Sequence, residues 1–573
     1  MFEIVFFCVL STIIFFTVGQ IFNQKIINLA NNQQDNSSIN IIFGIIVFGF
    51  IGLLINFFSS LNIYINTIIF SFILLYFSLY ILKKKGEIKK LVIDIITISI
   101  ISSISIYLSN INRPDAGLYH LPYTKILNDF KIIFGVSNIH FRFGHTSLIQ
   151  YSNALNYNFL FKEKGILIPQ ALLIISVLYY FGKKIYLKIF NNKLNSNFIF
   201  LFICFCFSIL NFNRYSSFGN DAGGNILYIF LVYKTFSLIQ KKIVSVDDVF
   251  FVSLLSLFCF VQKSFLIFSF IIPILLILNF HLKNINKIIL SKKFYILSFL
   301  IFCFFSKNII TSGCLIYPST ITCMKNLSWY NNDTTSREEI MAEAWAKDWI
   351  NSNFTENPEE YIKSFNWTNT WTDNHFKILI KKVLPSLILI IIIFIFIIAS
   401  NKKHRKYEII DFEKKIYIIL ASVSIISLCF WFLKFPIYRY GSGIIGGSII
   451  ILSFFLLLKK IKLTKLNNYK NFFIIFFSLL ILAILVKNIL KINDNFNTKY
   501  NQYPWPKIYS LTDTQNRLNK LNFEKYTNEG NFMFYIARDG YCMYGPSPCT
   551  YYIEKNIIKE KFFNYNVYLI NKK

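Results

Sequence analysis

The stretch LPSLILIIIIFIFIIAS, residues 384–400, decides the fold class of this chain, because it holds no charged side chain. Its length is close to the ~20 residues that an α-helix needs to cross a bilayer. Similar apolar blocks recur along the chain, so that 55% of its 573 residues are hydrophobic and only 15% are charged. Soluble domains carry about 25% charged residues. We therefore predict an all-α polytopic membrane protein.

The apolar blocks predict about 14 transmembrane helices when a span is taken as ~20 residues. Several of the blocks are short, and their ends are uncertain by about two to four residues. The predicted spans are Ile4–Ile21, Ile39–Phe58, Ile63–Leu82, Leu91–Leu108, Ile166–Phe181, Phe198–Phe212, Asn225–Ile239, Val249–Val261, Phe265–Phe280, Phe294–Ile309, Ile378–Ala399, Ile416–Leu433, Ile444–Leu458 and Phe472–Val486.

These spans divide the chain into two domains. Residues 1–489 form the transmembrane domain, and residues 490–573 are too polar for the bilayer. We expect the second part to be a small mixed α/β external domain. It should contain a helix near Thr514–Leu521 and a strand near Phe532–Ala537.

The net charge of +30 would suggest a nucleic-acid partner if the protein were soluble. Here Lys and Arg cluster in short loops between spans, which the positive-inside rule assigns to the cytoplasm. The run KKKGEIKK, residues 83–90, is such a loop, so the next span delivers RPDAGLYH, residues 113–120, to the external face. We expect no nucleic-acid partner. We expect an integral protein of a bacterial inner membrane, surrounded by lipids, with its site and C-terminal domain on the periplasmic side.

The ten cysteines agree with this orientation. Cys314 with Cys323, and Cys542 with Cys549, form two close pairs in segments assigned to the outside. Close pairs in an oxidising compartment predict disulfides, with free thiols as the alternative. The other six lie in predicted spans, where they behave as small apolar residues: Cys8, Cys204, Cys206, Cys259, Cys303 and Cys429.

The two external loops, at about 110–163 and 311–376, also carry helix signals. Apolar residues within Gly117–Gly135 repeat at helical spacing opposite a polar face, which predicts a helix lying in the membrane interface. Ser336–Glu339 has the pattern of a capping box that opens a helix. Pro358 follows an Asn and predicts the start of another.

The run RPDAGLYH places an acid, a base and an imidazole at the mouth of a predicted span. Ionisable groups at that depth are costly, so they indicate a functional site. Asp115 can act as a general base if a substrate hydroxyl reaches it, and a neighbouring Arg113 or His120 can tune it. The alternative is that Asp115 caps the helix starting at Gly117 and pairs with Arg113. The two roles are compatible.

The downstream run HFRFGH, residues 140–145, lies in the same loop and supplies Arg142 and His145 as further candidate substrate contacts. The chain has no Cys-rich or H-E-x-x-H ligand set, so we predict no metal held by the protein alone. The one cofactor that stays open is a divalent cation shared between Asp115 and a substrate phosphate.

Four predicted spans carry a cation at or near their external ends: Arg214, Lys263, Lys307 and Arg439. The positive-inside rule disfavours Lys and Arg at the external face, so their presence there needs a reason. Both side chains bind phosphate groups. We predict a phosphate-binding role for these residues, with Arg439 first. The alternative is snorkelling of side chains that only flank apolar helices. Asp221, in the turn GNDAGGN, is either a second acid or the partner of Arg214.

An aspartate in the first large external loop, between an outward span and an amphipathic helix, resembles the GT-C superfamily of polytopic glycosyltransferases. Several stretches are also similar to an uncharacterised bacterial membrane-protein family near that group: RPDAGLYHLPY (113–123), HFRFGHTS (140–147), SGCLIYPS (312–319), PIYRYGSG (436–443) and PSPCT (546–550). The chain departs from the common pattern in two ways. Four spans precede the loop where one is usual, and Asp115 is a single acid instead of an acidic pair.

The resemblance implies inverting transfer of a sugar from a polyprenyl-phosphate donor to a glycan, lipid or protein acceptor. Asp115 would deprotonate the acceptor hydroxyl, and His120 would stand in for the missing second acid. A cation such as Arg439 would stabilise the departing lipid phosphate. The alternatives are a polysaccharide polymerase or ligase outside the GT-C group, and a membrane transporter. The sequence shows no pair of Pro/Gly-broken helices at the midplane, which disfavours the transporter.

Overall fold

The structure is a computed structural model that describes residues 2–27, 36–83, 88–108, 115–212, 219–241, 243–349, 357–363, 365–400, 411–460, 469–496, 523–527, 532–538, 541–551 and 556–570. Within these ranges, twelve helices are long and apolar enough to cross a membrane. Each predicted span overlaps a helix. Two of these helices are not among the twelve because they are shorter than 18 residues: α8 (Ser196–Asn211, 16 residues) and α10 (Val246–Gln262, 17 residues). The prediction of a helical integral membrane protein is confirmed.

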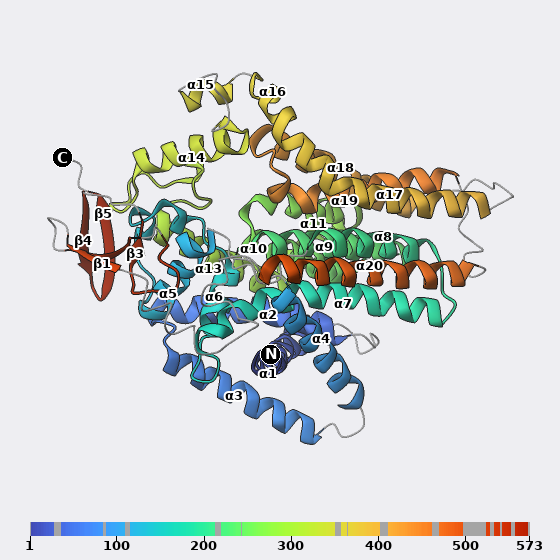
Figure 1. Ribbon diagram of the computed structural model, residues 1–573, viewed down its shortest axis with the longest axis horizontal. Coiled ribbons are helices and arrows are strands. Elements are labelled where there is room, and N and C mark those ends of the chain that lie inside the picture. The colour runs from blue at the N-terminus through green and yellow to red at the C-terminus, as the bar shows by residue number, and fades with distance from the viewer. Residues whose placement is uncertain are drawn as a thin grey trace.

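The long helices form one bundle that runs horizontally in Figure 1. The C-terminal strands lie at one end of this bundle, together with α5 and α14, and we call it the sheet end. Besides α8 and α10, the bundle contains α1 (Phe2–Phe22), α2 (Asn36–Phe58), α3 (Ile63–Lys83), α4 (Ile88–Leu108), α7 (Ile168–Phe190), α9 (Asp221–Ser237), the broken helix η7 (Ser264–Phe270), α11 (Ile271–Leu276) and η8 (Ile277–His281), α13 (Lys292–Ser312), α17 (Lys377–Ser400), α18 (Asp411–Lys434), α19 (Tyr438–Lys460) and α20 (Lys470–Phe496).

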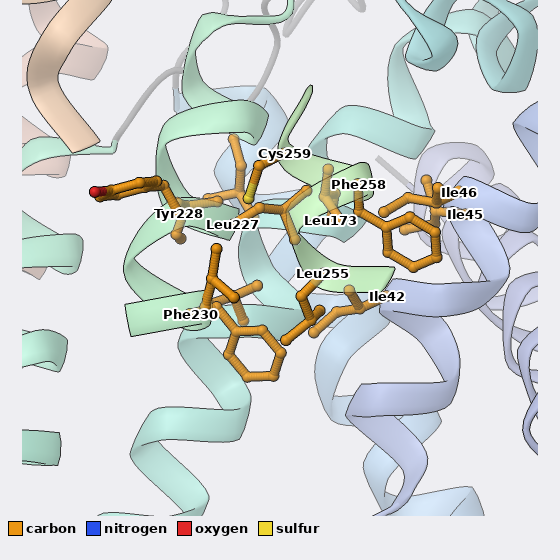
Figure 2. Close-up of a cluster of buried hydrophobic side chains, with 14 of the residues drawn as sticks. Ile42, Ile45, Ile46, Leu173, Leu227, Tyr228, Phe230, Leu255, Phe258 and Cys259 are labelled. Atoms are coloured by element: carbon orange, nitrogen blue, oxygen red, sulfur yellow. The ribbon is translucent and has the colours of Figure 1, made fainter. Parts of the chain in front are cut away.

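The centre of the bundle is packed with large apolar side chains. Figure 2 shows Ile45 of α2, Leu173 of α7, Leu227 of α9 and Phe258 of α10 in one cluster, and all four are fully buried. Because lipid tails are as apolar as this core, close van der Waals packing has to hold the helices together. Four helices from the first half of the chain therefore form the rigid frame of the bundle.

Two glycines let α1 and α2 touch. A Cβ atom on Gly19 would lie 1.7 Å from the carbonyl oxygen of Asn40, and one on Gly44 would lie 1.7 Å from that of Phe15. Larger side chains at these positions would force the backbones apart. Small residues at a crossing are a common basis of helix association in lipid.

The first loop is folded into short helices and is not one interfacial helix. Its elements are η2 (Ala116–His120), α5 (Leu121–Asp129), η3 (Val136–Asn138), η4 (Phe141–Gly144), α6 (Leu148–Leu155) and η5 (Lys162–Leu167). The helix predicted within Gly117–Gly135 is confirmed as far as Asp129, where α5 ends, and its predicted continuation is wrong, because Gly135 has a left-handed φ of 64°. Asn128 was expected on a polar face, but it is buried and donates to the carbonyl oxygens of Leu61 at 2.6 Å and Ala154 at 2.9 Å. This part of the loop is therefore packed inside the protein.

The second loop contains α14 (Asn332–Ala346), α15 (Pro358–Lys363) and α16 (Trp367–Trp371). The predicted capping box is wrong, because Asn331 caps α14 and Ser336 lies inside the helix. Glu339 instead accepts a hydrogen bond from the backbone N–H of Thr320 at 3.1 Å. The start of α15 at Pro358 is confirmed.

The described part of the C-terminal region is a small β structure. Its strands are β1 (Phe523–Thr527), β2 (Met533–Ala537), β3 (Cys549–Thr550), β4 (Ile557–Phe562) and β5 (Tyr565–Ile570). β2 pairs antiparallel with β1 and parallel with β3, and β4 pairs antiparallel with β5. The predicted strand near Phe532–Ala537 is confirmed, and the predicted helix near Thr514–Leu521 lies outside the described residues.

The C-terminal region is bonded directly to the first loop. The backbone N–H of Met543 donates to the carbonyl oxygen of Gly117 at 2.9 Å. The hydroxyl of Tyr544 donates to Oδ1 of Asn128 at 3.1 Å. A Cβ atom on Gly117 would lie 2.4 Å from Sδ of Met543, so a larger residue there would displace the Met543 side chain. Hydrogen bonds from the C-terminal region therefore hold both η2 and α5 in place.

Both predicted cysteine pairs lie at disulfide distance. The sulfur atoms of Cys314 and Cys323 are 1.98 Å apart, and those of Cys542 and Cys549 are 2.03 Å apart. The six other cysteines lie in helices of the bundle and are free thiols.

We expect both disulfides in the purified protein. Alkylation of the denatured protein without reductant should modify none of the four paired cysteines, and alkylation after reduction should modify all four. The free thiol of Cys429 is the internal control, because it should be modified in both samples. Modification of all four without reductant would contradict the pairing.

We expect Asn128→Ala to destabilise the protein by about 1–3 kcal/mol, because a buried amide with several hydrogen bonds is lost. Thermal unfolding in detergent measures the change. Asp129→Ala is the matched control, since the exposed ion pair of Asp129 with Lys125 should contribute no more than about 1 kcal/mol. Equal stability of both variants would show that the buried amide does not hold the loop.

Candidate functional site

Four charged residues from four separate segments meet at the sheet end of the bundle. Asp115 directly precedes η2, and Asp221 is the first residue of α9. Lys263 joins α10 to η7, and Arg439 is the second residue of α19. We call these four residues the ion-pair cluster. All four were predicted as site residues from their positions at span ends.

Arg439 is the centre of the ion-pair cluster. Its Nη1 atom lies 3.0 Å from Oδ2 of Asp115, and its Nε atom lies 2.8 Å from Oδ2 of Asp221. Lys263 binds the other oxygen of Asp221 through Nζ. Two carboxylates and two cations thus neutralise one another, as charges near a low-dielectric environment must.

Exposure differs across the ion-pair cluster. The side chains of Asp115 and Arg439 are 38% and 36% exposed, whereas that of Lys263 is only 10% exposed. The pair of Lys263 and Asp221 therefore forms the inner part, and Asp115 and Arg439 face the side that a substrate can reach.

Tyr440 adds an aromatic wall that the sequence prediction missed. The Nζ atom of Lys263 lies 4.3 Å from the centroid of the Tyr440 ring, and Cζ of Arg439 lies 5.4 Å from it. Both distances suit cation–π contact, which holds the cations in place without neutralising them. The signal available in the sequence was the position of this tyrosine directly after Arg439.

A close contact between α9 and α19 sets the position of Arg439. Nδ2 of Asn225 donates to the carbonyl oxygen of Arg439 at 3.2 Å, and Oδ1 of Asn225 accepts from the N–H of Gly443 at 2.9 Å. A Cβ atom on Gly443 would lie 2.7 Å from the carbonyl oxygen of Asn225. The GNDAGGN and YRYGSG motifs therefore meet each other, and this contact brings Asp221 to Arg439.

Asp115 does not cap the following helix. Its side chain makes no capping hydrogen bond to η2, and it binds Arg439 instead. The capping alternative is therefore wrong. Arg113 and Arg214, the other predicted partners in this region, lie outside the described residues.

His120 lies one helical turn after Asp115, next to the ion-pair cluster. Burial lowers the pKa of its imidazole to about 4, although the carboxylates of Asp115 and Asp221 oppose this shift. Its Nδ1 atom lies 3.4 Å from Nε2 of Gln150. His120 is therefore neutral at neutral pH and can act as a hydrogen-bonding group, not as a cation.

The other predicted contacts lie outside the ion-pair cluster. Burial lowers the pKa of His145 to about 3, and its ring packs against Tyr317 with centroids 5.1 Å apart. Lys307 is fully buried and donates from Nζ to the carbonyl oxygen of Thr146 at 3.1 Å. Arg142 lies over the ring of Tyr119, with Cζ 5.9 Å from the centroid.

Tyr119 connects Arg142 to the ion-pair cluster. Burial raises the pKa of its hydroxyl, and the charges of Asp115, Arg142 and Arg439 all act on it. The RPDAGLYH motif therefore supplies both Asp115 to the ion-pair cluster and the Tyr119 ring to Arg142.

In the described ranges, no group of three His, Cys, Asp or Glu side chains is placed to hold a metal ion. The divalent cation shared with a substrate phosphate stays a prediction. The chemistry that these residues can support directly is acid–base and phosphate chemistry: a partly exposed carboxylate beside a guanidinium, with a second carboxylate and an ammonium behind them.

A protein-family profile described as "Domain of unknown function (DUF8201)" matches residues 1–446. No curated protein and no solved structure shows significant similarity to the chain. The matched range includes the whole ion-pair cluster and the first loop, but it ends before the C-terminal strands. Because the profile covers 446 of the 573 residues, the chain belongs to the family described as Domain of unknown function (DUF8201).

Proposed function

We propose that this protein is a membrane glycosyltransferase. It transfers a sugar from a polyprenyl-phosphate donor to a hydroxyl of a glycan, lipid or protein acceptor, on the periplasmic side of a bacterial inner membrane. The observation that supports this proposal most is the bridge from Arg439 to both Asp115 and Asp221. It joins a candidate base to a candidate phosphate ligand at the sheet end of a membrane bundle.

The cost of the ion-pair cluster supports a functional role. Each charge removed from water costs several kcal/mol, and apolar residues of similar size are often as stabilising as a buried pair. Charges at the boundary of a membrane core are rare unless they bind a substrate or carry protons. If these positions served stability alone, apolar side chains at the ends of α9, α10 and α19 would be sufficient.

The proposed reaction is a single displacement with inversion at the anomeric carbon. Asp115 accepts the proton of the acceptor hydroxyl while the acceptor oxygen forms a bond to the anomeric carbon. The bond from that carbon to the phosphate oxygen breaks, and the polyprenyl phosphate leaves with the bonding electrons. Arg439, with Lys263 behind it, stabilises the charge on the leaving phosphate.

The same geometry couples donor binding to the base. A guanidinium has five N–H donors in a fixed fork, so Arg439 can bind a phosphate oxygen while it retains Asp221. A phosphate that takes the place of Asp115 on Nη1 leaves that carboxylate available to the acceptor hydroxyl. Asp115 then becomes the base only when a donor is present.

We expect Asp115→Asn to lower the rate of sugar transfer by about 10²- to 10⁴-fold, the usual contribution of a general base. Purified protein in detergent is assayed against a panel of polyprenyl-phosphate sugars, and thermal unfolding verifies the fold. Asp129→Asn is the matched control, because it removes a carboxylate from the same loop outside the ion-pair cluster and should leave the rate unchanged.

Full activity of Asp115→Asn would remove Asp115 as the base. Movement of a solute into sealed vesicles without any lipid-linked sugar would point to the transporter alternative. Changes in glycan chain length, with dependence on the arginines and not on Asp115, would point to a polymerase.

We expect Arg439→Lys to weaken donor binding by about 10- to 100-fold, because hydrogen bonds to charged groups contribute about 1.5–3 kcal/mol. Lysine keeps the charge but cannot contact Asp221 and a phosphate through one planar fork. The KM for the donor measures the effect. Arg538→Lys, which alters an exposed ion pair with Glu524 in the C-terminal sheet, should leave KM unchanged. An unchanged KM in Arg439→Lys would exclude Arg439 as a ligand of the donor phosphate.

A further inference from the structure

A second group of polar and aromatic side chains lies beside the ion-pair cluster. Its centre is Arg142 in η4, whose guanidinium makes no hydrogen bond or ion pair with any described residue. Cζ of Arg142 lies 5.0 Å from the ring centroid of Phe141 and 5.9 Å from that of Tyr119. An arginine that contacts aromatic rings and has no acid partner among the described residues can present its donors to a ligand.

Glu338, on α14, is the acid of this group. It is half-buried, and its carboxylate reaches no donor among the residues that the structure describes. Burial raises the pKa of Glu338 to about 6, and the positive charges of Arg142 and Arg337 oppose the shift. The helix that carries Glu338, α14, contacts η4, which carries Arg142, and the two side chains do not form a salt bridge.

Tyr551 completes the group from the C-terminal region. It directly follows β3, and its ring packs edge-on against His140 with centroids 4.9 Å apart. It is 40% exposed, so part of this residue is accessible to a ligand. Burial raises the pKa of its hydroxyl, Arg142 opposes this shift, and the carboxylates of Glu338 and Asp115 add to it. Tyr551 thus packs on His140, the residue that precedes η4 and its Arg142.

We propose that Arg142, Glu338, Tyr119 and Tyr551 form a carbohydrate subsite that holds the acceptor glycan next to Asp115. This inference rests on the proposed function and specifies it, because it selects a glycan from the three acceptor classes. A guanidinium and a carboxyl that have no partner among the described residues offer donors and acceptors to sugar hydroxyls. The rings of Tyr119 and Tyr551 offer flat apolar surfaces to the C–H faces of a pyranose.

The composition of this subsite argues against other ligands. A lipid phosphate would bind Arg142 but would be repelled by Glu338, and the ion-pair cluster already supplies two cations for a phosphate. An aliphatic chain would cover Arg142 and Glu338 and leave both without partners, which is costly. Sugar hydroxyls can donate to the carboxylate and accept from the guanidinium at the same time.

Direct binding tests this subsite separately from catalysis. Saturation-transfer NMR titrations of the full-length protein in detergent use methyl glycosides of glucose, galactose, mannose and N-acetylglucosamine as probes. We expect at least one glycoside to bind, and Glu338→Gln and Arg142→Gln each to weaken that binding at least tenfold. Glu360→Gln, on the exposed face of the neighbouring helix α15, is the matched control and should bind as the native protein does.

The pH dependence of binding gives a second readout. Hydrogen bonds to an ionised carboxylate are about twice as strong as those to a neutral group, so affinity should fall as the pH decreases through about 6. Burial lowers the pKa of His120 to about 4 and those of His140 and His145 to about 3, so these neighbours titrate below that step. The charged neighbours are Arg142 and Arg337, and arginine is not deprotonated in proteins. Burial raises the pKa of the Tyr119 and Tyr551 hydroxyls, so both stay protonated throughout. Glu338→Gln should therefore abolish the step.

The outcomes separate this inference from the proposed function. Glycoside binding that survives in Asp115→Asn while transfer is lost supports both. Unchanged binding in Glu338→Gln and Arg142→Gln, or no binding of any probe by the native protein, overturns the subsite. In either of those cases the effect of Asp115→Asn on transfer still decides the proposed function.

Discussion

The arrangement of the sheet end depends on one side chain, the guanidinium of Arg439, which holds carboxylates from two distant segments. Asp115 comes from the first loop and Asp221 from the start of α9, 3.0 Å and 2.8 Å from different atoms of the same fork. A lysine could not hold both in one plane. Because Lys263 also binds Asp221, the ends of α9, α10 and α19 are fixed at one level, and Asp115 is fixed relative to all three.

The C-terminal region has a structural role in the same site. Tyr544 bonds to Asn128 across 416 residues of sequence, and Met543 bonds to Gly117. These contacts hold the segment that carries Asp115 and His120, and in the same region Tyr551 packs against His140. The family profile ends at residue 446, so it covers the ion-pair cluster but not Tyr551. The C-terminal region therefore adds residues to one side of the candidate site, whereas the ion-pair cluster lies wholly within the range that the family profile matches.

The sequence predicted the helices, the cysteine pairs and the charged residues at span ends, because each of these signals is local. It could not predict which ends meet. Periodicity identifies α9 and α19 separately, but the contact of Asn225 with Gly443 depends on packing in three dimensions. The same limit explains Asn128, which looks polar on a helical wheel yet satisfies carbonyl groups inside the protein. Glu338 was missed because no sequence pattern connects α14 to the first loop.

The distribution of charge also indicates which species the ion-pair cluster would bind most strongly. A sugar attached to polyprenyl phosphate is a diester with one negative charge, whereas the leaving polyprenyl phosphate is a monoester that carries about −1.5 to −2 at neutral pH. Arg439 and Lys263 would therefore interact more strongly with the leaving group than with the donor. Interactions that strengthen toward the transition state accelerate a reaction, and those of equal strength in both states do not. Two cations behind a single base thus suit a transfer in which negative charge accumulates on the phosphate, and they would contribute much less to a channel that only passes the lipid-linked sugar.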